Sequence, residues 1–122
     1  MNNGEKILLV EDDRDFSESL AIMMRMRGHE LVTVFCAEDA MAQIERERFG
    51  LILIDFRLPG MSGGEFLDWV HRQTPQTSTV LMTGCDRNAP ELDSVKSGAV
   101  DKILFKPFKI KDLLSIVENL LK

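Results

Sequence analysis

The residues best suited to chemistry in this chain directly follow short apolar runs. They are Glu11, Asp12, Asp13, Asp55, Thr83 and Lys106. Carboxylates brought together repel one another and raise their pKa values, and a hard divalent cation relieves that repulsion. Mg²⁺ prefers oxygen ligands in octahedral geometry, whereas Zn²⁺ favours His and Cys, which this set lacks. The residue types therefore favour a magnesium site.

The remaining members of the set favour phosphoryl chemistry beside that metal. A carboxylate such as Asp55 can act as a nucleophile and form an aspartyl phosphate. Lys106 supplies a mobile positive charge for one phosphate oxygen, and the Thr83 hydroxyl can donate a hydrogen bond to another. Backbone N–H groups near Arg57 and Gly84 would complete this set of groups that bind the phosphate oxygens.

The apolar runs that precede these residues are predicted strands. They lie at 6–10, 51–54, 79–82 and 102–105, and a more mixed run lies at 31–35. Runs of this length without polar alternation are typical of strands covered on both faces, as in a parallel sheet. The carboxyl ends of parallel strands share one edge, where ligands of such sheets bind. We therefore expect the polar residues to meet in one cleft.

Amphipathic patterns between the strands predict five helices. Four have a clear apolar stripe, carried by the segments Phe16 to Met24, Ala37 to Ile44, Phe66 to Val70 and Ile110 to Leu121. A weaker pattern over 88–97 has only Leu92 and Val95 as large apolar residues. Strands alternating with helices indicate an α/β fold, a (βα)5 doubly wound unit with a five-stranded parallel sheet.

Helix-end signals support this interpretation. Asp13 is predicted to cap the first helix and Gly28 to end it. Ser62 and Glu65 have the spacing of a capping box at the start of the third helix. His29 lies just beyond the first helix and is predicted to be a surface residue, as is His71 in the third helix.

Composition limits the function classes. The chain has 122 residues and a net charge of −5, which suits one domain over residues 1–122. Acidity without a long basic run argues against nucleic-acid binding by this domain. Cys36 and Cys85 lack the spacing of a zinc site or a disulfide framework. No apolar run approaches the roughly 18 residues of a membrane helix, so we expect no membrane association and a cytoplasmic location.

The polar segments together resemble the receiver domain of two-component response regulators, over essentially the whole chain. Residues 7–13 resemble the family's opening strand with its acidic pair, and residues 53–63 its phosphoacceptor segment. Residues 82–84 resemble its switch hydroxyl, and 106–108 its lysine with the following proline, usually joined by a cis bond. The resemblance implies a flavodoxin-like strand order, 2-1-3-4-5.

The resemblance also implies a role for each site residue. Asp55 is then the phosphoacceptor, and its phosphoryl group comes from a phosphohistidine on a sensor histidine kinase or phosphotransfer protein. Thr83 and Lys106 would bind phosphoryl oxygens. The implied magnesium ligands are Asp12, Asp55, the backbone carbonyl of Arg57 and, through water, Glu11.

The implied function is a signalling switch rather than an enzyme acting on an outside substrate. Phosphorylation would change the face formed by 88–97, 102–105 and 110–121, and a homodimer through that face is a possible consequence. The family often has Tyr or Phe three residues before its lysine, where this chain has Ile103. We therefore expect a smaller repacking of the fifth strand.

Three other functions stay open at the sequence level. A phosphatase resembling the haloacid dehalogenase family needs a second acid two residues after the nucleophile, where this chain has Arg57. A flavin-binding module needs a hydroxyl- and glycine-rich loop after the first strand, where this chain has three acids. A receiver-like interaction domain that has lost phosphorylation would not need the intact residue set.

Overall fold

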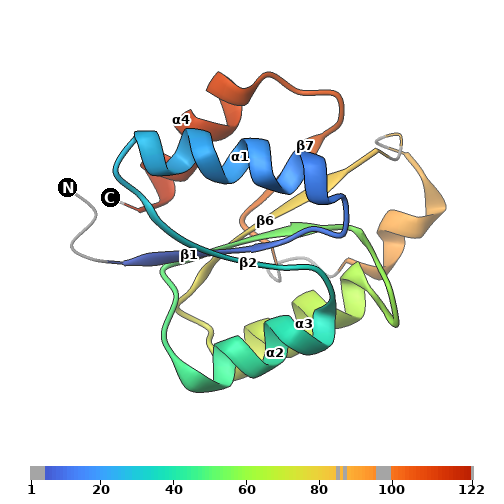
Figure 1. The fold of residues 1–122 in the computed structure, drawn as a ribbon. Helices are drawn as coiled ribbons and strands as arrows, with labels where there is room; N and C mark the ends of the chain where they lie inside the picture. Colours follow the sequence, from blue (N-terminus) through green and yellow to red (C-terminus); the bar gives the residue numbers. More distant parts are fainter. Residues whose placement is uncertain (1–4, 85, 87, 96–99, 122) are drawn as a thin grey trace.

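Five parallel strands form the central sheet of this protein, shown as a computed structural model in Figure 1. The structure describes residues 5–84, 86, 88–95 and 100–121. In chain order the strands are β1 (Lys6–Val10), β2 (Glu30–Val34), β3 (Leu51–Asp55), β6 (Ser78–Thr83) and β7 (Lys102–Phe105). Their spatial order is β2-β1-β3-β6-β7, which confirms the predicted order 2-1-3-4-5.

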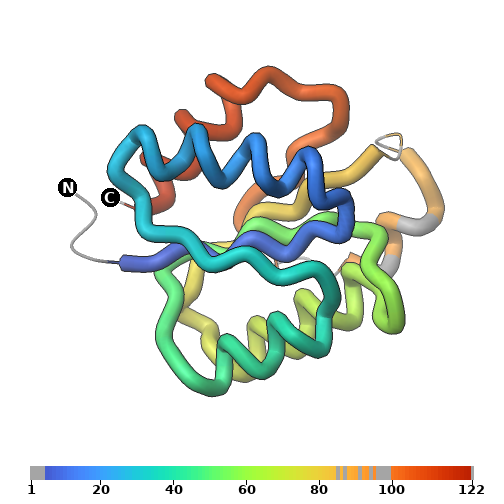
Figure 2. Tube along the Cα trace, viewed as in Figure 1, coloured from blue at the N-terminus to red at the C-terminus, as the bar shows by residue number. Residues whose placement is uncertain are grey.

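Helices cover both faces of the sheet. α1 (Arg14–Met26) and α4 (Ile110–Leu120) lie on one face, and α2 (Ala37–Arg46) and α3 (Gly63–Gln73) lie on the other. The trace in Figure 2 shows the sheet passing between these two helical layers. This layering explains why the strands carry apolar residues without polar alternation.

Alternate residues of each strand enter two different cores. In β1, Leu8 and Val10 join the cluster that packs against α2 and α3. Ile7 and Leu9 join the cluster that packs against α1 and α4. All four side chains are fully buried, so β1 is held from both sides.

The predicted helix-end signals are confirmed. Asp13 Oδ1 accepts a hydrogen bond from the Phe16 N–H at 3.1 Å, which caps α1. Ser62 Oγ accepts from the Glu65 N–H at 3.1 Å, and the Glu65 side chain accepts from the Ser62 N–H at 3.4 Å. Gly28 has φ +87°, the left-handed conformation expected where α1 ends.

The predicted helix over 88–97 was wrong in type and extent. Within the described part, 88–95, only Pro90–Ser94 is helical and forms a 3₁₀ helix, η1, and residues 96 and 97 lie outside the described residues. Leu92 and Val95 are half-buried against the α2/α3 cluster. Two apolar anchors bury too little surface to hold a longer helix against the sheet.

The prediction that His29 lies on the surface was also wrong, whereas His71 is exposed as predicted. His29 is only 8% exposed, and neither ring nitrogen has a hydrogen-bond partner among the described residues. Its Nε2 lies 4.0 Å from Glu118 Oε2 on α4, and the same oxygen pairs with Arg27 at 3.2 Å. The packing of α4 beside the end of α1 covers this histidine, and the local sequence contains no signal of that packing.

Candidate functional site

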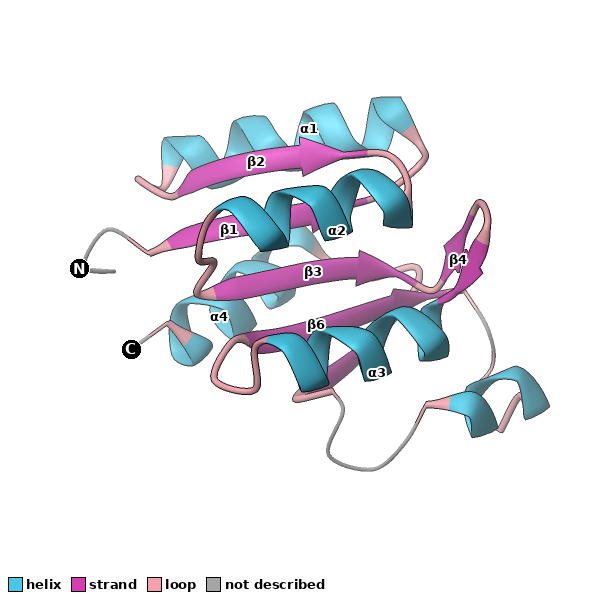
Figure 3. Cartoon of the chain, turned by 90° about the horizontal axis from the view of Figure 1, so that it is seen from below, coloured by secondary structure: helices cyan, strands magenta, loops and turns pink. Residues whose placement is uncertain are grey.

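The polar residues predicted to act together lie at one edge of the sheet. Glu11 and Asp12 follow β1, Asp55 ends β3, Thr83 ends β6 and Lys106 follows β7. The strand arrows of the central sheet in Figure 3 point in one direction, so these carboxyl ends share that edge. The parallel topology therefore brings together residues that are far apart in the sequence.

Three acids form a compact cluster there. Glu11, Asp12 and Asp55 each offer a carboxylate oxygen, and these oxygens lie within 4.8 Å of one another. Glu11 is fully buried and Asp55 is 8% exposed, whereas Asp12 is exposed. Negative charges held this close, two of them away from water, fit a site that binds a hard cation.

The environment of Glu11 shows the cost of this clustering. Burial raises the pKa of Glu11 to about 7, and its interaction with Asp55 acts in the same direction. The Asp13 N–H, which donates to Glu11 Oε2 at 3.1 Å, opposes the increase in pKa, as does the charge of Lys106. The Glu11 carboxylate is thus only partly compensated by the protein itself.

Lys106 contacts both buried acids. Its Nζ lies 3.2 Å from Glu11 Oε1 and 3.6 Å from Asp55 Oδ1. The same ammonium lies 5.0 Å from the centre of the Phe16 ring, a cation–π contact that the sequence did not indicate. The Lys106–Pro107 peptide bond is cis, as the resemblance implied.

A backbone hydrogen bond links Thr83, at the end of β6, to Lys106, which follows β7. Thr83 is 1% exposed, and its carbonyl accepts a hydrogen bond from the Lys106 N–H at 2.6 Å. Gly84 follows at the surface, and a Cβ there would meet nothing within 4 Å. The neighbouring Cys85 lies outside the described residues.

A small hairpin after β3 was not predicted. β4 (Arg57–Leu58) pairs antiparallel with β5 (Met61–Ser62), as Figure 3 shows at the end of β3. Gly60 in its turn has φ +84° and follows Pro59, so the Pro-Gly pair is the signal that could have predicted the turn. The hairpin begins at Arg57, two residues after Asp55.

A recess of about 670 Å³ adjoins the acid cluster. We call it the β4–β5 recess, and its lining is Asp12, Phe56, Arg57, Leu58, Pro59, Met61 and Ser62. Because Asp12 belongs both to this lining and to the acid cluster, the two are continuous. Four of the seven lining residues are apolar and two, Asp12 and Arg57, are charged, so the recess has a mainly apolar wall beside charged groups.

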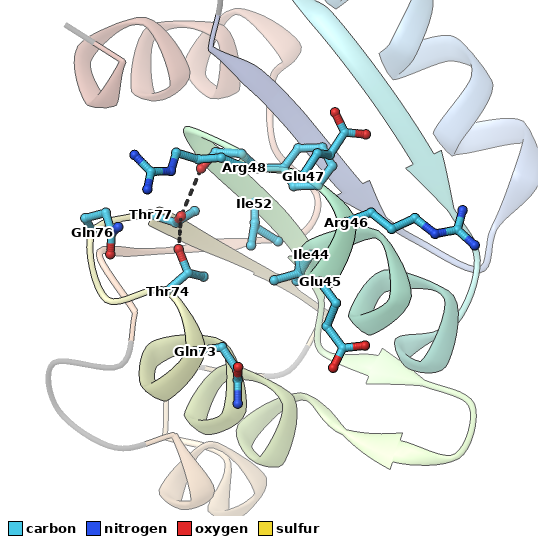
Figure 4. Close-up of a pocket in the computed structure, with 11 residues that line it drawn as sticks. Ile44, Glu45, Arg46, Glu47, Arg48, Ile52, Gln73, Thr74, Gln76 and Thr77 are labelled. Atoms are coloured by element: carbon cyan, nitrogen blue, oxygen red, sulfur yellow. Dashed lines mark hydrogen bonds between the residues drawn. The ribbon is translucent and has the colours of Figure 1, made fainter.

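A second depression, of about 480 Å³, lies at the opposite end of the sheet, beside the segments that follow α2 and α3 (Figure 4). Its threonine hydroxyls are already engaged. Thr74 Oγ1 and Thr77 Oγ1 share a hydrogen bond of 2.7 Å, and Thr77 Oγ1 donates to the Phe49 carbonyl at 2.9 Å. These bonds connect the segment that follows α3 to the segment that follows α2.

The family model of the response regulator receiver domain matches residues 7–118. The chain therefore belongs to that family. It is 38% identical over 112 residues to the response regulator protein FleR of Pseudomonas aeruginosa, covering 92% of this chain and 24% of that protein. It is 28% identical to the sensory transduction protein RegX3 of Mycolicibacterium smegmatis, over 95% of this chain and 50% of that protein.

Solved structures show the same fold. A CheY-like receiver domain protein from Methanospirillum hungatei superposes with a TM-score of 0.89 at 29% identity, covering 96% of this chain and 93% of that one. The chemotaxis response regulator CheY4 of Vibrio cholerae gives 0.84 at 26% identity, covering 95% and 98%. These neighbours confirm the flavodoxin-like receiver fold.

Membership defines the class of this protein. It is a phosphoacceptor domain of two-component signal transduction, a family whose members interact with histidine kinases. The chain spans about a quarter of one curated relative named above and half of the other. Among the described residues, no helix is long and apolar enough to cross a membrane.

Proposed function

We propose that Asp55 is the residue that receives the phosphoryl group. One observation carries the proposal: the Lys106 ammonium lies 3.6 Å from Asp55 Oδ1 at the edge where the acids meet. A fixed cation beside the nucleophile stabilises the charge on transferring phosphoryl oxygens. Thr83, at the end of the adjacent strand, would donate to another of those oxygens.

We further propose that the acid cluster holds Mg²⁺. Asp12 and Asp55 would be direct ligands with the Arg57 carbonyl, and Glu11 would act through water. The donor set fits, because it contains only oxygens and because Asp12 and Arg57 line the same recess. When bound, Mg²⁺ would neutralise the acids and polarise a phosphoryl oxygen.

The transfer itself uses the residues of this chain. An Asp55 carboxylate oxygen attacks phosphorus, so a P–O bond forms while the P–N bond to the donor imidazole breaks. The electron pair of the broken bond goes to the imidazole nitrogen, and water supplies the proton that this nitrogen takes up. Lys106 holds the phosphoryl oxygens while this happens, and its pairing with Glu11 and Asp55 positions it beforehand.

The proposed output is a change of partners rather than a reaction on an outside substrate. The donor would be a sensor histidine kinase or a phosphotransfer protein, and the domain would bind neither nucleic acid nor membrane. The responding face would be η1, β7 and α4, with a homodimer across it as one outcome. Ile103 on β7 is half-buried against the α2/α3 cluster, so a small shift there would alter that face. A cytoplasmic location stays a prediction.

Intact mass after incubation with acetyl phosphate and Mg²⁺ tests the proposal. We expect one added phosphoryl group on the wild type, none on Asp55→Asn, and none when a chelator removes Mg²⁺. The Asp86→Asn variant, which changes an exposed acid outside the cluster, is the matched control and should be labelled like the wild type. Equal labelling of Asp55→Asn would refute the assignment.

A further inference from the structure

We propose that the β4–β5 recess binds the aromatic leaving group of the phosphodonor and so selects donors by that group. This inference rests on the proposed role of Asp55 and names the donor subsite beside it. The observation behind it is the continuity of an apolar recess with the acid cluster through Asp12.

The two sides of the acid cluster differ in chemistry. On one side Lys106 contacts Glu11 and Asp55, and it does not line the recess. On the other side the recess is lined by apolar residues, among them Leu58 and Met61, together with the charged Asp12 and Arg57. A phosphodonor has a matching division, because its phosphoryl group is anionic and its leaving group carries the carbon atoms. The charged part belongs beside Lys106, and the apolar part belongs in the recess.

The volume and exposure of the recess are sufficient to admit a small aromatic ring. Its volume of about 670 Å³ lies within the range of small-molecule sites. Leu58 and Met61 are half-buried and Pro59 is exposed, so their apolar surfaces can be reached from solvent. The imidazole of a phosphohistidine is bonded directly to phosphorus and therefore lies next to the acid cluster during transfer. Its flat faces would pack against these side chains.

The hairpin gives this wall a defined shape. The register of β4 and β5 places Leu58 opposite Met61. A Cβ at Gly63 would lie 2.8 Å from the Phe56 carbonyl oxygen, so the chain closes tightly behind the recess. An acetate leaving group has little apolar surface, so it gains little from the packing of Leu58 and Met61. The recess should therefore distinguish aromatic from acyl donors.

Two small phosphodonors test the inference without a protein kinase. N-phosphorylated imidazole and acetyl phosphate both deliver a phosphoryl group, but only the first has an aromatic leaving group. Intact mass would give the initial labelling rate with each donor in the presence of Mg²⁺. We define the donor ratio as the rate with N-phosphorylated imidazole divided by the rate with acetyl phosphate. We expect Met61→Gln and Leu58→Ser each to lower the donor ratio roughly threefold to tenfold, the size of one aromatic or apolar contact.

The control variant is Met26→Gln, the same change on an exposed residue of α1 outside the recess. It should keep the wild-type donor ratio. Because both donors are measured on the same preparation, partial misfolding of Leu58→Ser cancels from the ratio, and Met61→Gln provides a second test.

The outcomes separate the two proposals. If neither donor labels wild-type Asp55, the proposed function is wrong. If acetyl phosphate labels the wild type and the recess variants keep its donor ratio, only the recess inference is overturned. A fall in both rates by the same factor also overturns it, because the recess would then act on the shared chemistry of the site.

Discussion

The central strand β3 and the edge strand β7 differ in how completely they are buried. Every residue of β3 is buried, and helices pack on both of its faces. β7 lies at the edge, its residues are exposed or half-buried, and the short η1 lies between it and β6 along the chain. Asp55 belongs to the firm centre, whereas Lys106 follows the looser edge. We infer that a phosphoryl group in contact with the Lys106 ammonium would displace β7 more readily than β3.

The largest expected effect comes from one substitution made in both regions. Leu53 on β3 is fully buried, and Leu104 on β7 is half-buried against the same core. Leu53→Ala should lower the free energy of unfolding by about 3 kcal/mol, and Leu104→Ala by about 1 kcal/mol, because less apolar contact is lost. Urea denaturation measures both. Equal losses would mean that β7 is packed as firmly as the centre.

The acids at the centre predict a pH dependence. Burial raises the pKa of Glu11 to about 7 from the ordinary carboxyl value, so the folded state holds this proton more tightly than the unfolded state. The stability of the metal-free protein should therefore fall as pH rises from about 4.5 to above 7, by on the order of 3 kcal/mol.

Thermal unfolding across that pH range checks this prediction. Glu11→Gln should remove the decrease, whereas Glu18→Gln, an exposed change on α1, should keep it. Added Mg²⁺ should restore stability at high pH in the wild type, because a bound cation offsets the repulsion. A metal-free wild type whose stability rises over this range would contradict the raised pKa of Glu11.

The helices that follow β1 and the edge strand β7 differ in their caps. Asp13 caps α1 with a side-chain hydrogen bond, and Lys109 at the start of α4 makes none. Asp13→Ala should cost about 1 kcal/mol, and Lys109→Asp should add roughly 0.5 kcal/mol by supplying the missing acceptor. Chemical denaturation of both variants checks the pair. A destabilising Lys109→Asp would show that the start of α4 is held in another way.

A similarly small effect is expected at η1. Leu92 is half-buried, so Leu92→Ala should cost about 0.5–1 kcal/mol and leave acetyl phosphate labelling of Asp55 unchanged. Hydrogen exchange should show faster opening at η1 than at β3 in the wild type. Equal protection of the two segments would remove the contrast between centre and edge.

Features with a local physical cause were predictable. The strand runs, the Asp13 and Ser62 caps and the turn at Gly28 depend on neighbouring residues, so periodicity and capping rules predict them. The meeting of the acids was predictable as well, because parallel strands can bring their carboxyl ends only to one edge. The Pro59-Gly60 turn had a local signal too, although the hairpin was not predicted from it.

What the sequence by itself determined is the alternation of strands and helices, the family and the set of polar residues at the strand ends. Only the tertiary structure decided the burial of His29 and Glu11, the short 3₁₀ helix η1 in place of a longer helix, and the recess beside Asp12. These features depend on which surfaces pack together. Burial, and with it the pKa of Glu11, arises from contacts between segments far apart in the chain, which no local pattern specifies.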